Sequence, residues 1–480
     1  MTKRPGIAMS KAWVRLGSRF LPFADAATEG LPLPRLLRLS LFQVSVGLAM
    51  VLLTGTLNRV MIVELGVPAT VVAVMVALPI LVAPVRALIG HRSDTYRSYL
   101  GWRRVPFIWL GTLLQFGGFA IMPFALLVLS GGGEAAVPYA GEIGAALAFL
   151  LVGAGMHTVQ TAGLALACDL APEDSRPRVV ALLYLVLLLG MFVSAVALSL
   201  LLADFGHVLL IQVVQGAAAV TMVLNLVALW KQEGRDPRLT AHERVRQSFA
   251  EAWAGFAQAP GARRLLVAVA LGSAGFAMQD VLLEPYGGEV LGLGVGQTTL
   301  LTALLAGGTI LGLFIAARVL DRGMNPYRLS GFGALAGIGA FTLVIVSAPL
   351  QSAALFRAGT ALIGFGGGLY TVGLLTAAMN LGRITGSGIA LGAWGAAQAT
   401  AAGLAIAVGG GVRDIVAAMA ANGTLGSVFA SADAGYGVVY HIEIALLFAA
   451  LVAVGPLARY AGPEARRRDG DTFGLAAFPG

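Results

Sequence analysis

Twelve apolar segments, each long enough to cross a membrane, constrain this chain more than any other feature. A bilayer core about 30 Å thick needs about 20 apolar residues in a helix. Only 12% of the residues are charged, against about 25% in soluble domains. The sequence therefore predicts an all-α integral membrane protein with twelve transmembrane helices. They lie at roughly 38–63, 69–90, 106–130, 141–167, 179–203, 208–230, 264–290, 297–319, 329–349, 353–379, 388–410 and 438–458.

The basic residues fix the predicted orientation. If both termini are cytoplasmic, the cytoplasmic segments hold 28 of the 32 Lys and Arg residues. Basic residues concentrate in cytoplasmic loops of membrane proteins. We therefore expect a multi-pass protein of a bacterial inner membrane with both termini in the cytoplasm. The net charge of +8 then reflects topology, and no nucleic-acid partner is expected.

The longest polar segment between spans divides the chain into two halves. We predict a six-helix bundle at 36–230, a linker at 231–263 and a second bundle at 264–460. Thr240 and Glu243 form a capping box that begins an amphipathic linker helix. A basic amphipathic stretch lies in the N-terminal segment, 1–35, and favours a helix on the inner leaflet or a solvated tail. A cytoplasmic tail covers 461–480.

A repeated loop motif relates the two halves. Residues 90–94 read Gly-His-Arg-Ser-Asp, and 317–322 read Ala-Arg-Val-Leu-Asp-Arg, both after the second helix of a half. Parallel repeats of this kind are typical of two-bundle transporters. The residues of this cytoplasmic motif are Gly90, Asp94, Arg103, Arg104, Asp321 and Arg322.

The first copy resembles the loop motif of the major facilitator superfamily, G-x-x-x-D followed by G-R-R, with an insertion at 95–100. The second copy has alanine for the first glycine and lacks the trailing arginines, which puts a standard gating cycle in doubt. A narrower resemblance, to the PucC/LhaA family of purple bacteria, covers about residues 34–460. It is carried by LNRVMIVELGVP at 57–68, GAGMHTVQTAG at 153–163 and QDVLLEPYGG at 279–288.

This resemblance implies a role in assembling light-harvesting complexes, with a leaning to the core-complex, LhaA-like member. It implies bacteriochlorophyll as the bound ligand, with carotenoid as a second pigment. The implied partners are antenna polypeptides, the reaction-centre core complex, and pigment-synthesis or membrane-insertion machinery.

Two carboxylates lie inside the seventh span, where charge is costly. Asp280 and Glu284 are four residues apart and share a helical face, with Gln279 beside them. The symmetry-related first span carries Arg59. We predict an ion pair between Arg59 and one of the carboxylates that closes the outer side. Proton coupling and a pigment contact are the alternatives.

Further candidate pigment contacts lie on the fourth and tenth spans. His157 and Gln160 share a face, and a neutral imidazole can ligate a chelated metal; the alternative is a bond to a neighbouring helix. A glycine patch can leave a slot for a flat macrocycle or allow close helix packing. Its residues are Gly364, Gly366 and Gly368. His441 and Glu443 are expected to snorkel at the outer interface.

Motifs of soluble enzymes are missing from the sequence. None of the three lysines lies in a phosphate-binding loop, and no metalloprotease helix or nucleophile elbow occurs. We therefore expect neither an enzyme nor a metal site of the protein's own. Two functions remain: an assembly factor that binds pigment within the bilayer, or an alternating-access facilitator that moves a small amphipathic compound by proton coupling.

Overall fold

A computed structural model describes residues 31–81, 89, 93, 102–130, 139–172, 175–234, 257–385, 387–424 and 433–460. All regular structure in these ranges is helical, which confirms the predicted all-α class. Gly90, Asp94, both predicted amphipathic segments and the tail after residue 460 lie outside the described residues. Eleven described helices are long and apolar enough to span a membrane, so the protein is a multi-pass membrane protein.

The first half begins with a long, irregular span. Its parts are α2 (Leu33–Val51), the π-helical turn η1 (Leu52–Thr56), α3 (Leu57–Arg59) and a second π-helical turn, η2 (Val60–Glu64). The other helices are α4 (Ala69–Leu81), α6 (Val105–Leu129), α7 (Ala140–Leu170), α8 (Arg176–Leu201) and α9 (His207–Leu229). Helix α4 is the second predicted span, as far as the structure describes it.

The second half also begins with a broken span, formed by α11 (Ala262–Ala277), the 3₁₀ turn η5 (Met278–Val281) and α12 (Leu283–Glu289). It continues with α13 (Val295–Asp321), α14 (Pro326–Ser347), α15 (Ala353–Thr385), α16 (Ser387–Ala421) and α17 (Ala434–Tyr460). The predicted span at 388–410 is therefore too short, because α16 continues to Ala421.

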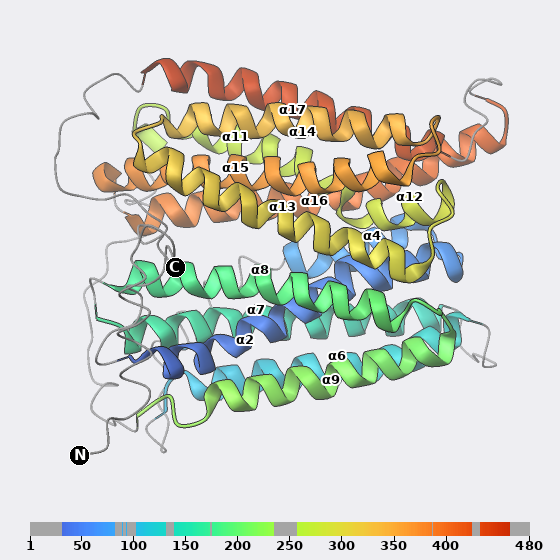
Figure 1. Cartoon of the computed structure of the whole chain (residues 1–480), viewed down its shortest axis with the longest axis horizontal. Coiled ribbons are helices and arrows are strands. Elements are labelled where there is room, and N and C mark those ends of the chain that lie inside the picture. Colours follow the sequence, from blue (N-terminus) through green and yellow to red (C-terminus); the bar gives the residue numbers. More distant parts are fainter. Residues whose placement is uncertain are drawn as a thin grey trace.

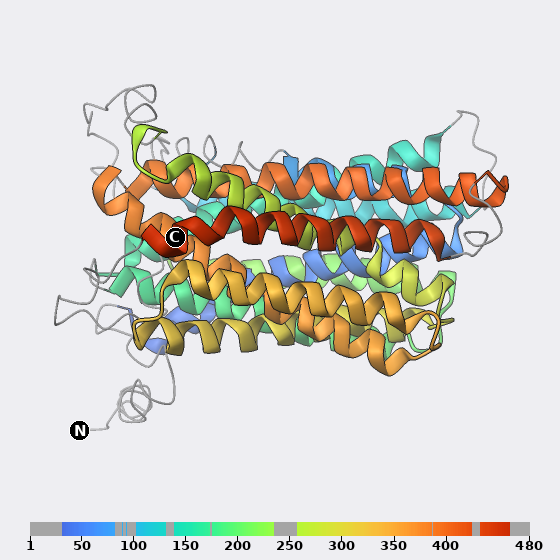
Figure 2. The same ribbon diagram turned by 90° about the horizontal axis from the view of Figure 1, so that it is seen from above.

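The helices run side by side along the long axis of the molecule, with α11 and α13–α17 on one side of Figure 1 and α2 and α6–α9 on the other. Figure 2 shows the same parallel arrangement from above. Helix α2 begins and α17 ends at one end of the molecule, here called the terminal end; the opposite end is the far end.

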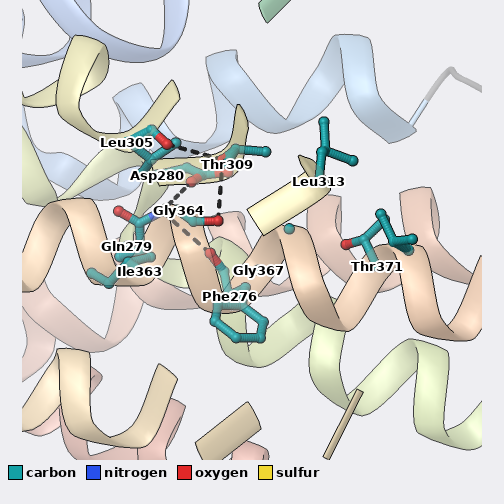
Figure 3. A pocket seen from close by; sticks show the side chains of 12 residues that line it. Phe276, Gln279, Asp280, Leu305, Thr309, Leu313, Ile363, Gly364, Gly367 and Thr371 are labelled. Carbon is teal, nitrogen blue, oxygen red and sulfur yellow. Dashed lines mark hydrogen bonds between the residues drawn. The ribbon is translucent and has the colours of Figure 1, made fainter. Parts of the chain in front are cut away.

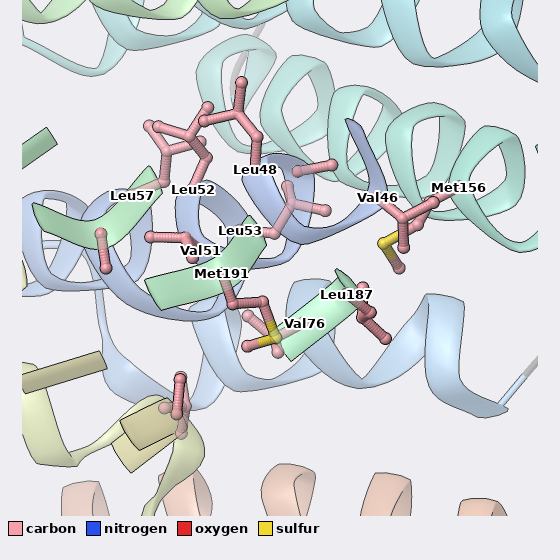
Figure 4. Packing of buried hydrophobic residues seen from close by; sticks show 14 of the residues in the cluster. Val46, Leu48, Val51, Leu52, Leu53, Leu57, Val76, Met156, Leu187 and Met191 are labelled. Carbon is pink, nitrogen blue, oxygen red and sulfur yellow. The ribbon is translucent and has the colours of Figure 1, made fainter. Parts of the chain in front are cut away.

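Close packing within each half depends on small residues and apolar side chains. A Cβ atom on Gly155 of α7 would lie 2.5 Å from the carbonyl oxygen of Gly111 on α6, so glycine lets these helices touch. Figure 4 shows side chains of α2, α4, α7 and α8 meeting in the core, among them Val46, Val76, Met156 and Leu187. An apolar surface on all sides suits helices buried in lipid and protein.

The two halves contact each other through α4 with α16 and through α8 with α13. Thr70, in the first turn of α4, donates its backbone N–H and its hydroxyl to Asp414 of α16, both at 2.7 Å. A Cβ atom on Gly296 would lie 2.5 Å from the carbonyl oxygen of Ser199. These contacts lie where α4 and α13 begin and α8 ends, so the halves are joined at the far end.

Candidate functional site

The seventh span breaks at Gln279 and Asp280. A 3₁₀ turn inside a longer helix frees backbone groups that an α-helix would pair, and such groups must be satisfied within the protein inside a membrane. The backbone N–H of Gln279 donates to Glu443 Oε1 on α17 at 2.7 Å. The carbonyl oxygen of Asp280 accepts from Asn58 Nδ2 of the first half at 3.1 Å. The break is thus stabilised by one side chain from each half.

Arg59 lies in α3 of the first span and is 3% exposed. Its predicted ion pair with Asp280 or Glu284 is wrong, because Nη1 binds Glu64 at 2.5 Å instead. The π-helical turn explains this choice: Leu65 N–H bonds to the Val60 carbonyl five residues earlier, so residues i and i+5 lie one above the other. Arg59 still joins the halves, because Nη2 donates to the carbonyl oxygen of Leu293 at 3.2 Å.

Glu284 is buried at the contact between the halves, where it binds a hydroxyl instead of a cation. Thr302 of α13 donates its hydroxyl to Glu284 Oε1 at 2.6 Å. The same oxygen would lie 2.5 Å from a Cβ atom on Gly55. The absence of a side chain at Gly55 therefore lets this carboxylate approach the first span.

A cavity of about 250 Å³ opens beside the break (Figure 3), and its lining residues lie near the middle of α13 and α15, at mid-height of the bundle. Helices α11, α13 and α15 form its walls. Its lining is mostly apolar, and among the described residues that line it only Asp280 carries a charge. The lining residues are Phe276, Gln279, Asp280, Leu305, Thr309, Leu313, Ile363, Gly364, Gly367, Gly368, Thr371 and Val372.

Hydrogen bonds orient the polar groups of this cavity. Gln279 donates its side-chain amide to Asp280 Oδ1 and to the carbonyl oxygen of Phe276. The Thr309 hydroxyl bonds to the carbonyl oxygens of Leu305, at 2.9 Å, and Gly364, at 3.2 Å. Asp280 is half-buried and, together with Gln279, forms the polar part of the wall.

The predicted pigment contacts separate into two groups. Gln279, Gly364 and Gly368 lie together on the cavity wall. Gly366 does not line the cavity, because residue i+2 of a helix faces away from residues i and i+4. A Cβ atom on Gly366 would lie 2.7 Å from the carbonyl oxygen of Gly333. The predicted slot is therefore wrong for Gly366, which serves the packing of α15 against α14.

His157 and Gln160 lie on α7 of the first half and do not line this cavity. Gln160 is buried, and its Nε2 lies 3.5 Å from Gln43 Oε1 of α2. His157 is half-buried. The structure therefore does not bring His157 together with Gln279 and the glycines, and its role as a magnesium ligand stays a prediction.

At the terminal end, the two arginines of the loop motif bind within the first half. Arg103 and Arg104 bind Asp169 of α7 at 2.7 and 2.9 Å. Glu233, after α9, accepts the backbone N–H groups of residues 103–105 and caps α6. In the second half, Asp321 and Arg322 are exposed at the end of α13.

The role of Glu443 was not predicted from the sequence. It is fully buried and holds the break in the seventh span, so the prediction that it snorkels at the interface is wrong. A usable signal was present: Tyr436, Tyr440 and Glu443 recur at helical spacing, which places the acid on an aromatic, buried face. The contact of Asp414 with Thr70 was not predicted, because an acidic residue near a helix end is usually exposed to solvent.

Comparison with known proteins agrees with the fold. A structure described as a bacterial homologue of the human lysosomal transporter Spinster, in an inward-facing and unoccupied conformation, superposes with a TM-score of 0.65 at 14% identity, over 91% of this chain and 98% of that one. The POT family transporter PepTSo superposes with a TM-score of 0.62 at 13% identity, over 89% and 99%. These likenesses confirm the major-facilitator-like fold.

Several bacterial proteins are far more similar to this chain in sequence. A Rhodobacter capsulatus protein described as uncharacterised, in the puhA-bchM intergenic region, is 56% identical over 97% of this chain and 98% of its own length. Protein PucC of Rhodovulum sulfidophilum is 59% identical over 84% and 89%. The profile of the family described as PUCC protein matches residues 56–462. The chain belongs to this PucC family.

Proposed function

We propose that this chain is a non-enzymatic assembly factor for photosynthetic light-harvesting complexes, and that it delivers bacteriochlorophyll to antenna polypeptides around the reaction centre. The observation that carries the proposal is the PucC family match across residues 56–462. A further relative, 30% identical over 88% of this chain and 95% of its own length, is named the bacteriochlorophyll synthase 44.5 kDa chain in Rhodobacter capsulatus. That name links a relative to the same pigment.

The mid-bundle cavity supports an apolar ligand with one polar edge. Its wall combines Phe276, aliphatic side chains and glycines with the Gln279–Asp280 pair, and ligand sites commonly place a few polar groups in an apolar wall. At about 250 Å³ the cavity lies below the roughly 300–1,000 Å³ of drug-sized sites. It therefore suits an edge or substituent of a macrocycle, or the end of a carotenoid, rather than a whole pigment.

The proposed setting is the bacterial inner membrane, with both termini cytoplasmic. The partners are antenna polypeptides and the reaction-centre core complex, with pigment-synthesis or membrane-insertion machinery as sources of the cargo. The positive charge of the segments assigned to the cytoplasm supports this orientation. In it, the far end of the bundle faces the periplasm.

The test is an absorption spectrum of the protein, gently solubilised and affinity-purified from photosynthetic cells, with identification of co-purifying antenna polypeptides. We expect bacteriochlorophyll bands and antenna subunits of the core ring. Gly367→Leu would fill the cavity, since a Cβ atom there meets Phe276 only at 3.6 Å, and should lower the pigment-to-protein ratio several-fold. Gly339→Leu is the control, because nothing lies within 4 Å of a Cβ atom there.

A colourless protein without antenna subunits would contradict the proposal. Uptake of a small amphipathic compound by proteoliposomes, driven by a proton gradient, would instead support the facilitator function. If Gly367→Leu and Gly339→Leu lowered the pigment content equally, the pigment would not bind in this cavity.

A further inference from the structure

Four polar side chains meet where the broken seventh span touches the first span. Asn58 comes from the first half, and Gln279, Asp280 and Glu443 come from the second half. Asn58 binds the Asp280 carbonyl, the Gln279 backbone binds Glu443, and the Gln279 amide binds the Asp280 carboxylate. We call these four residues the seam cluster. Hydrogen bonds connect all four members.

Three buried oxygen atoms of the seam cluster have no hydrogen-bond partner among the described residues: Asn58 Oδ1, Gln279 Oε1 and Glu443 Oε2. The three side chains are 0%, 2% and 0% exposed. Buried polar atoms are almost always paired, and leaving them unpaired is costly. Each of the three is an acceptor, so the cluster lacks donors or positive charge.

The amide orientations are fixed by their own hydrogen bonds. Asn58 Nδ2 donates to two carbonyl oxygens, those of Thr54 and Asp280. Gln279 Nε2 donates to the Phe276 carbonyl and to Asp280 Oδ1. Exchanging nitrogen and oxygen in either amide would place oxygen against oxygen. The unpaired atoms are therefore oxygens.

The nearby arginines bind other partners. Arg59 pairs with Glu64, and Arg413 pairs with Glu289 and Asp414 at the far end. The other charged or titratable groups on the elements packed around Glu443 are Arg263, Arg264, Glu284, Tyr286, Tyr327, Arg328, Tyr436, Tyr440 and His441. None of these, in the part of the chain that the structure describes, forms an ion pair or hydrogen bond with Asp280 or Glu443.

We infer that the seam cluster binds a small monovalent cation, an alkali ion or a proton, between its carboxylate and amide oxygens. Hard cations prefer oxygen ligands, and a proton on one carboxylate would supply the missing donor. Access comes through the mid-bundle cavity, because Asp280 lines that cavity and is only half-buried. The inference does not depend on pigment binding.

Binding at this place ties the two halves together. Asn58 belongs to the first half and the other three residues to the second, so the complete set of oxygens exists only while the halves meet here. A ligand that binds one arrangement more tightly shifts the population towards it. Occupation of the seam cluster therefore favours the arrangement in which the far end is joined.

The test measures the melting temperature of the full-length, pigment-free protein in detergent. At pH 8, NaCl is compared with choline chloride at equal ionic strength; a second series varies pH in choline chloride alone. If the ligand is an alkali ion, NaCl raises Tm saturably, by about 2 °C or more. If the ligand is a proton, NaCl has no specific effect and Tm falls as pH rises, because the folded state binds the extra proton.

Two variants assign either effect to the seam cluster. Glu443→Gln removes the charge but keeps an oxygen that can accept the Gln279 N–H, and Asp280→Asn keeps both its carbonyl and an acceptor. We expect whichever dependence the wild type shows to be reduced at least several-fold in each variant that folds. Glu142→Gln, in the first turn of α7, is the control and should respond like the wild type.

The inference is overturned if the wild type shows neither dependence, or if both seam variants respond to Na⁺ and pH like the wild type. Because the measurement uses pigment-free protein, a colourless preparation contradicts only the proposed function.

Discussion

At the scale of single residues, the buried charge of Arg59 is paired by a residue about one helical turn further along the same span. Arg59 is 3% exposed, and a buried charge needs a partner. Glu64 supplies it from the same span, because the π-helical turn η2 places residue 64 over residue 59. The Nη2 group of the guanidinium is then available to donate to the Leu293 carbonyl oxygen of the second half.

We expect Glu64→Gln to lower the free energy of unfolding by about 1–3 kcal/mol, because it leaves the buried guanidinium with a weaker partner. The estimate stays below that for a fully buried pair, since the Glu64 side chain is 32% exposed. Thermal unfolding in detergent measures it, with Glu142→Gln of α7 as the control. Equal melting temperatures for the two variants would show that the ion pair contributes nothing.

Sequence reasoning found the buried polar residues better than it found their partners. Asn58, Arg59, Asp280 and Glu284 all lie at contacts between the halves, as expected from charge inside apolar spans. The ion pair was predicted from depth along ideal α-helices, and depth does not specify the direction of a side chain. The π-helical turn η2 brings Glu64 to Arg59, and apolar composition carries no signal of such a turn.

At the scale of helices, glycine sets how closely α13 and α15 approach. A Cβ atom on Gly364 would lie 2.0 Å from the Leu305 carbonyl oxygen, and one on Gly308 would lie 2.0 Å from that of Ala361. These paired glycines allow backbone-to-backbone contact beside the cavity. The predicted close-packing role of the glycine patch is therefore confirmed for Gly364, which also lines the cavity.

We predict that Gly364→Ala lowers the free energy of unfolding by about 1–3 kcal/mol, because the added methyl forces two helices apart. Gly339→Ala, on the exposed face of α14, should be neutral or stabilising by about 0.5–1 kcal/mol, since alanine favours helix more than glycine does. Melting temperatures of the two variants in one detergent make the comparison. Two equal shifts would rule out packing at Gly364 as the cause.

Helix positions were predictable because apolar length alone specifies a membrane span. The breaks within the first and seventh spans were not predictable from the sequence. In the seventh span the 3₁₀ turn at 278–281 depends on Glu443, which lies 164 residues away from Gln279 in sequence. A local pattern cannot show that a distant carboxylate accepts a freed N–H group, so the position of the cavity beside this break was also beyond sequence reasoning.

At the scale of the whole molecule, polar contacts that cross between the halves lie towards the far end of the described residues. At the terminal end, Arg35 binds Gln232 and Arg264 binds the Ala453 carbonyl, each within one half. At the far end, Thr70 binds Asp414 across the halves. Asp414 accepts a backbone N–H in the first turn of α4 from the other half, which is a capping contact made in trans.

We therefore expect Asp414→Ala to open the far end. Loss of the capping contact and of the hydroxyl bond amounts to about 1–2 kcal/mol, which shifts an equilibrium by roughly 5–30-fold. Thr299→Cys is the reporter, because Thr299 is fully buried and contacts Thr56 of the first half at 3.2 Å. The background carries Cys168→Ser, which removes the single native cysteine.

The measurement is the rate at which a membrane-impermeant thiol reagent labels this cysteine. We expect faster labelling from the far side in Asp414→Ala and an unchanged rate in the control Glu142→Ala, which alters an acid at the same end but away from the contact between the halves. If Asp414→Ala labels no faster than the control, the Thr70–Asp414 contact does not hold the halves together. Closure of the far end would then rest on the packing of α4 with α16 and of α8 with α13, together with the other polar contacts between the halves, such as that of Arg59 with the Leu293 carbonyl.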